Sequence, residues 1–416
     1  MYNRIASSFF LSFTWLICSS NATAIKRDVT FANAEAAFST LQQWYNRSTG
    51  IRNPSTNWWN SANCITIISN LALIDNNVLP AVEDVLSNTY AQAPGYNALI
   101  NTETTKVMGM PSQQWMIATV NMTDTPDNNN EDTTVTTIPQ PPSRRAPRGG
   151  FLNDFYDDEG WWALAWIAAY DLTLNPSYLS TAQRIFADMH SVFGTTNCSS
   201  NTAPAVGGLP WDRKRTYINA ITNSLYLSVA AHLAERVTDV PPLYDYLSLA
   251  KQQWQWFLAS GLLNGENLIN DGLNPACSNN AGTIWSYNQG VLLGALTALS
   301  RATGDAVYLA TASRIADAAI GALAPDGVLV EACEPDCGSD GAQFKGVFVR
   351  GLAELWRARP EERWRGFLKG NAESAWVNGR DERGELGLRW TGPVGRPADA
   401  GTQSSGLDAL VAGLGV

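Results

Sequence analysis

The chain has 416 residues, of which 45% are hydrophobic and 16% are charged, and its formal net charge is −10 with a pI near 4.8. This is the composition of a globular protein that is long enough to bury a large core. A net negative charge argues against ligands that need a basic face, so we expect neither nucleic acid nor an anionic membrane as a partner. Neutral substrates fit this charge better.

Residues 1–24 have the pattern of a secretory signal peptide: a basic residue near the start, an apolar run and small residues at the end. The apolar run is too short for a membrane span. We therefore expect an exported protein, secreted or in the cell wall, with residues 25–416 forming one domain. Sequons for N-linked glycosylation begin at Asn46, Asn121 and Asn197 and are compatible with that route, although each alone is weak evidence.

Removal of the signal peptide leaves five cysteines: Cys64, Cys198, Cys277, Cys333 and Cys337. In an oxidising compartment cysteines pair where geometry allows, and an odd number leaves one of them free. We expect Cys333 to pair with Cys337 and Cys198 with Cys277, with Cys64 buried and unreactive. Residues 333–337 could also be read as a metal loop, but the chain has only two histidines and neither is near it, so no metal or other cofactor is expected.

An internal repeat predicts paired helices. Related segments begin at Tyr178, Tyr246, Tyr308 and Phe367, at intervals of roughly 60 residues. Ahead of them lie amphipathic stretches with helical spacing, at 160–173, 216–236, 285–302 and 344–358. Each pair of stretches is expected to form a helical hairpin.

Further candidate helices, at 31–46 and 63–89 near the front and at 403–414 near the back, bring the number of hairpins to about six if the ends close on each other. Strand-like alternation is not evident. The pattern predicts an all-α fold, a closed α/α barrel whose longer loops gather at one end. An open helical solenoid is the alternative, although its units are usually shorter. Residues 121–150 break the pattern, and their composition predicts a disordered insertion.

Two neighbouring acids, Asp157 and Asp158, stand directly ahead of an aromatic, helix-forming run. Buried carboxylates need partners or shifted pKa values, and a catalytic pocket supplies both. Neighbouring carboxyls at a loop-to-helix junction can converge on one bound atom, at about the ~5 to 5.5 Å spacing of retaining glycosidases. The simpler alternative is that these acids cap the helix and complement its dipole.

The segment YDDEGWW, which begins at Tyr156, resembles the signature of glycoside hydrolase family 76, the α-1,6-mannanases and their fungal cell-wall relatives. The resemblance continues in the expected order through segments that begin at Trp58, Gly207, Thr216, Trp285 and Phe344. It implies an (α/α)6 barrel and a retaining mechanism, with Asp157 as the nucleophile and Asp158 as the acid/base. The implied protein is a secreted endo-α-1,6-mannanase, which we expect to be monomeric.

The chemistry agrees with these roles, because the acid must hold a proton and needs apolar or like-charged neighbours. Asp158 has Asp157 and Glu159 beside it and Trp161 and Trp162 close by.

Aromatic and polar residues at presumed loops or helix starts are candidate sugar contacts, because a flat ring stacks on a pyranose while polar groups bond to its hydroxyls. The expected rings and polar groups are Trp59, Trp211, Trp285, Phe344, Asn63, Asp212, Asp271 and Lys345. Core packing is the alternative for any one tryptophan, and we expect it for Trp162 and Trp166. The charged run 212–215 is expected to be solvated or mutually paired rather than part of a site.

Three functions fit this sequence. The first is hydrolysis of α-1,6-linked mannan, and the second is transfer of the same glycosyl intermediate to another sugar during remodelling of wall mannan or a GPI-glycan. The third is a non-catalytic wall glycan-binding protein, against which the intact acid pair weighs. Wall-attached relatives end in an apolar tail for a lipid anchor, and no such tail is evident at 413–416, so we expect a freely secreted or a truncated chain.

Overall fold

The computed structural model describes residues 28–100, 150–199, 206–238 and 244–416. The signal peptide expected at 1–24 lies outside these residues, as does the insertion expected at 121–150 except for Gly150. Within the described ranges the fold is helical, and its only β-structure is a few isolated bridges.

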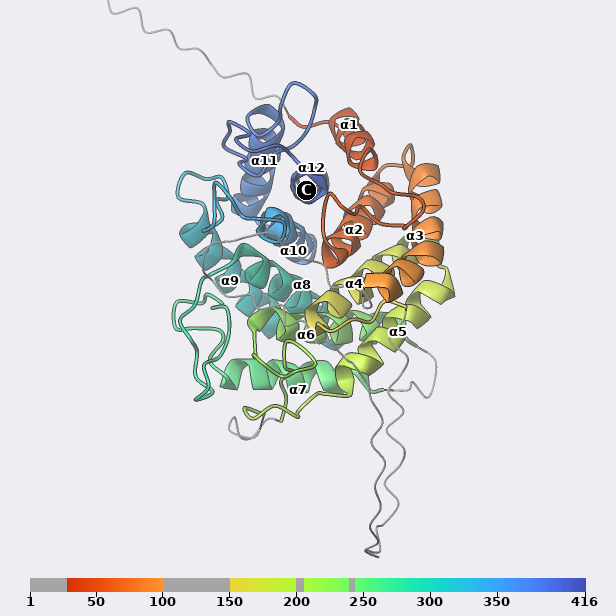
Figure 1. Cartoon of the computed structure of the whole chain (residues 1–416). Coiled ribbons are helices and arrows are strands. Elements are labelled where there is room, and N and C mark those ends of the chain that lie inside the picture. Colours follow the sequence, from red (N-terminus) through yellow and green to blue (C-terminus); the bar gives the residue numbers. More distant parts are fainter. Residues whose placement is uncertain (1–27, 101–149, 200–205, 239–243) are drawn as a thin grey trace, which may run out of the picture.

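The helices form two concentric rings (Figure 1). The inner ring consists of α2 (Trp58–Ile74), α4 (Tyr156–Thr173), α6 (Ala220–Arg236), α8 (Ser286–Thr303), α10 (Phe344–Ala358) and α12 (Ala400–Leu414). The outer ring consists of α1 (Phe31–Gln42), α3 (Leu79–Ile100), α5 (Pro176–His190), α7 (Tyr246–Ala259), α9 (Val307–Leu323) and α11 (Glu362–Val377). Each inner helix contacts the next, and α12 contacts α2, so the ring is closed. This (α/α)6 barrel confirms the predicted fold.

The ends of the chain form the sixth hairpin, because α1 packs against α12. The inner helix α12 is buried along almost its whole length, whereas the outer helix α5 buries only one face, with Tyr178, Ala182, Ile185 and Met189 among its buried residues. The inner helices α8 and α10 approach closely where Gly290 meets Gly351. A Cβ on Gly351 would stand 2.0 Å from the carbonyl oxygen of Gly290, so the absence of side chains there permits the packing.

The front of the chain differs from the prediction. The single helix expected at 63–89 is two helices, α2 and α3, which are separated by a turn at residues 75–78. In that turn the side chain of Asp75 accepts a hydrogen bond of 3.0 Å from the backbone N–H of Asn77. Apolar residues continue at helical spacing across the turn, so the hydrophobic pattern gives no sign that the helix is interrupted there.

Other boundaries shift by a few residues. Helix α4 begins four residues before the expected 160, which places both acids in its first turn, and α6 begins at Ala220 after the N-cap Asn219 rather than at 216. The helix expected from Phe367 begins at Glu362. Helix α10 has the expected bounds, 344–358.

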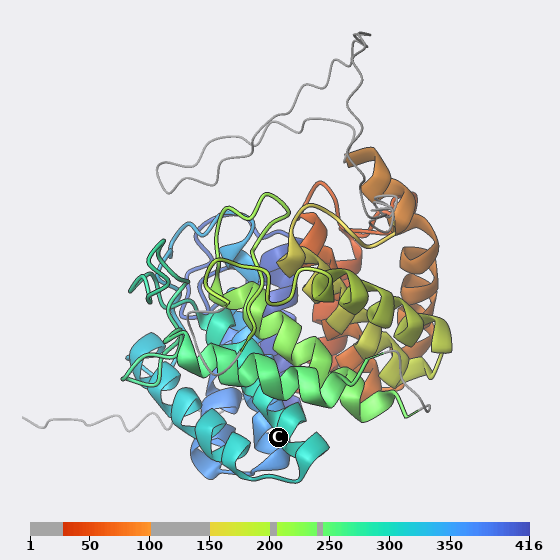
Figure 2. The same cartoon turned by 90° about the horizontal axis from the view of Figure 1, so that it is seen from below.

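The long connections lead from outer to inner helices and gather at one end of the barrel, the upper end in Figure 2. The inner helices all begin at this end, so their N-termini, which carry partial positive charge, face these loops. The Cys198–Cys277 disulfide joins two of the loops, and Cys333–Cys337 lies within a third. Both pairings confirm the prediction, as does the buried free thiol of Cys64.

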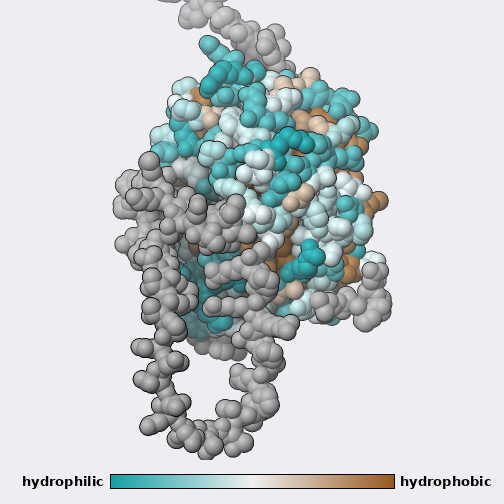
Figure 3. Space-filling model, turned by 45° about the vertical axis from the view of Figure 1, so that its right-hand side comes forward, coloured by the Kyte–Doolittle hydropathy of each residue, from teal (hydrophilic) through white to brown (hydrophobic). Residues whose placement is uncertain are grey.

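The described helices include none that is long and apolar enough to cross a membrane. On the face shown in Figure 3, apolar residues are scattered among hydrophilic ones.

Candidate active site

Asp157 and Asp158 lie in the first turn of α4, at the end of the barrel where the long loops gather. Both side chains are half-buried. The carboxylate of Asp157 accepts two hydrogen bonds, one of 2.9 Å from the indole Nε1 of Trp211 and one of 3.1 Å from the backbone N–H of Asp158. These donors and the helix N-terminus all stabilise a negative charge on Asp157.

Asp158 has one side-chain donor, the amide of Asn153, whose Nδ2 lies 2.5 Å from Asp158 Oδ2. The orientation of this amide is fixed, because its Oδ1 accepts a hydrogen bond of 2.9 Å from the backbone N–H of Phe155. The Oδ2 atom of Asp158 must therefore act as an acceptor. When Asp158 is protonated, its proton belongs on Oδ1.

The two carboxyls differ electrostatically. Burial raises the pKa of Asp157 above its usual range, and its hydrogen bonds from Trp211 and Asp158 oppose this rise. Burial also raises the pKa of Asp158, and the charge of Asp157 raises it further, against the single hydrogen bond from Asn153. Asp157 is thus the better placed of the two to ionise first, which leaves Asp158 holding a proton.

Behind the acid pair lies a buried ionic cluster. The side chain of Glu159 is fully buried and pairs with Arg213, which also bonds to Asp188 at 2.8 Å. Glu159 Oε1 accepts the backbone N–H of Asn153 at 3.1 Å, and Arg213 Nε donates to the Asn153 carbonyl at 2.6 Å. Contrary to expectation, Glu159 is turned toward Arg213 rather than acting as a like-charged neighbour of Asp158. The cluster instead holds the backbone that positions Asn153.

Aromatic rings pack beside the acid pair in a continuous group. Tyr287 stacks on Phe344 with ring centroids 3.8 Å apart, Trp59 stacks on Trp161 at 5.6 Å, and Trp285 meets Phe344 edge-on at 5.6 Å. The rings of Trp59 and Phe344 are largely covered. Trp211, Trp285 and Tyr287 keep partly exposed surface.

Two further carboxylates contact the aromatic group, Asp340 through Trp59 and Asp271 through Trp285. Asp340, directly before the short 3₁₀ helix η1 (Gly341–Gln343) that leads into α10, raises the pKa values of both Asp157 and Asp158 through its charge. Its Oδ1 accepts a hydrogen bond of 2.9 Å from Trp59 Nε1, and the residue is exposed. Asp271 accepts a hydrogen bond of 2.7 Å from the Tyr217 hydroxyl. A neutral, hydroxyl-rich ligand suits such a set of acceptors.

Three of the predicted polar sugar contacts are buried and bond to internal partners. Asn63 is buried one turn below Trp59 and bonds to Arg350. Asp212 is buried and accepts both the backbone N–H of Thr216, at 2.8 Å, and its hydroxyl, at 2.9 Å.

The third of them, Lys345, is 1% exposed and bonds to Glu334 and to the backbone carbonyls of Leu329 and Leu388. The core positions expected for Trp162 and Trp166 are confirmed, since both are fully buried.

The residues that the sequence did not single out are Asn153, Arg213, Tyr287 and Asp340. Asp340 lies one turn before the inner helix α10, at the start of η1, whereas the acid pair lies in the first turn of the inner helix α4. A search for polar residues at every inner-helix start would have found it. Within the described ranges, no group of His, Cys, Asp and Glu side chains is suited to hold a metal ion.

Comparison with known proteins identifies the family of this chain. The model of Glycosyl hydrolase family 76 matches residues 112–414. This chain belongs to that family.

Mannan endo-1,6-alpha-mannosidase DFG5 of Saccharomyces cerevisiae is 25% identical over 252 residues, covering 56% of this chain and 54% of that protein. Mannan endo-1,6-alpha-mannosidase DCW1 of Candida albicans is 27% identical over 255 residues, covering 56% and 55%. The chain therefore spans about half the length of the curated relatives that it matches.

Solved structures share the fold. An inactive variant of the alpha-1,6-mannanase GH76A of Salegentibacter, with two aspartates changed to asparagine and alpha-1,6-mannotriose bound, has a TM-score of 0.69 at 20% identity and covers 92% of this chain and 98% of that one. Dfg5 from Chaetomium thermophilum in complex with glucosamine has a TM-score of 0.67 at 18% identity, with coverages of 92% and 90%.

Proposed function

We propose that this protein is an exported endo-α-1,6-mannanase that hydrolyses its substrate with retention of anomeric configuration. The proposal rests mainly on the unequal hydrogen bonding of two neighbouring acids, since Asp157 accepts two fixed donors and Asp158 accepts one. Family membership supports glycoside hydrolysis. The names of the fungal relatives support mannan as the substrate, and the mannotriose-bound neighbour is inactive when two aspartates are replaced.

In the first step, ionised Asp157 attacks the anomeric carbon while Asp158 passes the proton on Oδ1 to the glycosidic oxygen. The bond between that oxygen and the anomeric carbon breaks, and the leaving sugar departs with a hydroxyl group. In the second step, the Asp158 carboxylate takes a proton from water, whose oxygen displaces Asp157 from the anomeric carbon. If a sugar hydroxyl replaces the water, the same site carries out transglycosylation.

For sugar binding, we propose that the partly exposed rings of Trp211, Trp285 and Tyr287 stack on pyranose faces. Asp271 and Asp340 accept hydrogen bonds from hydroxyls. The internal partners of Asn63, Asp212 and Lys345 favour structural roles for these side chains.

The test is digestion of purified α-1,6-mannan, followed by proton NMR from the first turnover, with and without an acceptor oligosaccharide. We expect shorter mannan fragments and an initial α-anomeric signal. The Asp305→Asn variant, which changes an exposed acid at the opposite end of the barrel, should match the wild type. An initial β signal would mean that a distant acid is the true partner. Cleavage of another glycan but not of this mannan would reject the substrate, and elongated acceptor would favour transfer.

Asn153 offers a separate test of the proton's position. Its hydrogen bond lowers the pKa of Asp158, so the Asn153→Ala variant should shift the alkaline limb of the kcat/KM profile to higher pH. Turnover at the optimum should fall by about 10- to 100-fold, because the Asp158 carboxylate that forms in the first step loses a hydrogen bond and, before that step, the proton is free to occupy either oxygen. The measurement is initial rate against pH. A uniform loss with an unmoved alkaline limb would show that Asn153 only supports the loop.

A further inference from the structure

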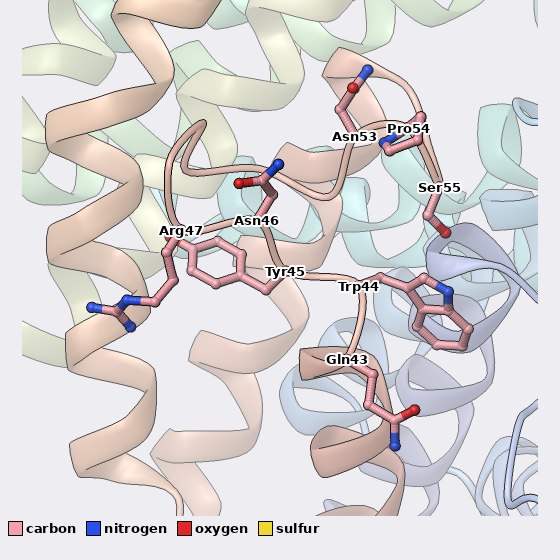
Figure 4. A pocket seen from close by; sticks show the side chains of 8 residues that line it. All are labelled: Gln43, Trp44, Tyr45, Asn46, Arg47, Asn53, Pro54 and Ser55. Atoms are coloured by element: carbon pink, nitrogen blue, oxygen red, sulfur yellow. The ribbon is translucent and has the colours of Figure 1, made fainter.

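A surface hollow of about 630 Å³ lies along the loop that follows α1 (Figure 4). We call it the Trp44 hollow, and its lining residues are Gln43, Trp44, Tyr45, Asn46, Arg47, Asn53, Pro54 and Ser55. None of them belongs to the candidate active site. The lining combines an indole ring with amide and hydroxyl groups, a combination with which proteins bind sugars.

One lining residue, Asn46, is also the first residue of a glycosylation sequon. Asn46 is exposed, and its Oδ1 accepts hydrogen bonds from the backbone N–H and the hydroxyl of Ser48, at 3.0 Å and 2.7 Å. These bonds fix the orientation of the amide. No hydrogen bond within the described part of the chain uses its Nδ2, the atom to which a glycan is attached.

The turn that begins at Asn46 is held in place. The backbone N–H of Asn46 donates to the carbonyl of Ile51 at 2.8 Å, and the carbonyl of Asn46 accepts the N–H of Gly50 at 2.8 Å. Arg47 pairs with Asp84 on α3 and points away from Trp44 in Figure 4. Asn46 thus lies on a fixed turn, two residues after Trp44. The neighbouring Arg47 side chain is held away from Trp44 by its ion pair.

The sequon at Asn197 differs in its serine, its middle residue and the residue two positions before it, although Asn197 is also exposed. Its Ser199 is buried, and the Ser199 hydroxyl is engaged with Thr196 Oγ1 at 2.8 Å. The middle residue, Cys198, is tied by a disulfide. The residue two positions before Asn197 is Thr195, so no ring stands there.

We infer that Asn46 carries an N-linked glycan whose first N-acetylglucosamine packs in the Trp44 hollow against the indole ring. The inference rests on the proposed export, because attachment takes place in the secretory route. There, Nδ2 of Asn46 bonds to C1 of the first sugar of a lipid-pyrophosphate-linked oligosaccharide. The bond from C1 to the pyrophosphate oxygen breaks, the lipid pyrophosphate leaves with the electron pair, and the amide loses one proton.

Attachment is tested by expressing the full chain in yeast and mapping peptides of the exported protein before and after peptide-N-glycosidase treatment in oxygen-18-labelled water, which marks each formerly glycosylated asparagine as a labelled aspartate. We expect nearly complete occupancy of Asn46, loss of that glycan in Ser48→Ala, and no change at Asn46 in Asn197→Gln. Activity on mannan should be equal in wild type and Ser48→Ala, so the outcome is independent of catalysis. Exported protein with bare Asn46 overturns the inference. Retention of the chain in the cytosol overturns the proposed export and the inference with it.

Packing against Trp44 has its own test. Endoglycosidase trimming leaves one N-acetylglucosamine on Asn46, and the trimmed protein should melt about 1 to 2 °C above Ser48→Ala. In a Trp44→Ala background this difference should vanish, and comparing differences removes the direct cost of losing the indole. A difference that survives in the Trp44→Ala background overturns the proposed contact.

Discussion

Replacing Asp158 by Asn is expected to lower turnover of α-1,6-mannan by about 10²- to 10⁴-fold, and replacing Asp157 by Asn to lower it at least as much. An amide has nearly the shape of the carboxyl group. It can neither pass a proton to the leaving oxygen nor form a bond to the anomeric carbon. Initial rates of mannan cleavage, with Asp305→Asn as the matched control, measure the effect.

The two variants should differ on an aryl α-mannoside whose leaving group departs as a stable anion. Such a leaving group needs no proton, so Asp158→Asn should recover the first step and accumulate the glycosyl-enzyme. Asp157→Asn should stay inactive because it lacks the nucleophile. If the variants behave in the opposite way, the two roles are exchanged, and wild-type turnover by both would reject the pair as the catalytic acids.

Neither substitution should destabilise the fold. Burial raises the pKa values of both acids, so between their unfolded and folded pKa values the folded protein binds more protons than the unfolded chain. Stability therefore falls as pH rises through that window. Each asparagine variant loses the contribution of the acid that it replaces, and its melting temperature at neutral pH should equal or exceed that of the wild type. Thermal scans between acidic and neutral pH provide the measurement.

The barrel could be predicted from the sequence because its units repeat and because most inner helices are followed within a few residues by an outer one. Helix α10 has the bounds that hydrophobic spacing predicts. The pattern failed at residues 75–78, where the turn depends on the side chain of Asp75 rather than on a break in the apolar spacing. Closure of the barrel, in which α12 packs against both α2 and α1, depends on long-range contacts, which the sequence suggested only through the number of hairpins.

The candidate site was predictable where its residues are neighbours in the chain. Asp157 and Asp158 can be recognised because they are adjacent in the sequence. Asp340 is far from them in the sequence and comes close only when the barrel folds. Residue type also does not say which way a side chain faces. The ring of Phe344 packs in the aromatic group, whereas the side chain of the next residue, Lys345, is buried and bonds to Glu334.

Asn63 shows the same limit along a helix axis. It follows Trp59 by one turn on the same face, so it lies about 6 Å deeper in the barrel. There it meets Arg350 from α10 rather than the loop end. A sequence pattern predicts which residues share a face of a helix. How far along that face the side chains still reach the site depends on the neighbouring helices.

The charged run 212–215 shows how an expectation for a whole run can fail at individual residues, here the buried Asp212 and the inward-facing Arg213. Lys214 and Arg215 are exposed, as a solvated run should be, whereas Arg213 turns inward to Glu159 and Asp188. Nothing in the run itself distinguishes Arg213 from its neighbours, because its partners come from α4 and α5.

The Arg213→Met variant is expected to lose about 3 to 5 kcal/mol of unfolding free energy, because Glu159 would be left buried without a counter-charge. The side chain of Glu159 is 0% exposed, and among the described residues its Oε2 atom has no hydrogen-bond partner even in the wild type. Urea denaturation at neutral pH measures the loss. The adjacent Lys214→Met variant changes an exposed charge and should stay within about 0.5 kcal/mol of the wild type.

Two further results separate the buried charge from lost packing. Adding Glu159→Gln to Arg213→Met should restore much of the stability, since the stranded carboxylate is removed. The deficit of the single variant should also shrink as pH falls, because burial raises the pKa of Glu159 and, without Arg213 to oppose this, its neutral form is favoured in the fold. An equal deficit at acidic and neutral pH, with no rescue in the double variant, would mean that Arg213 acts through its aliphatic contacts and its stacking on Tyr156 instead.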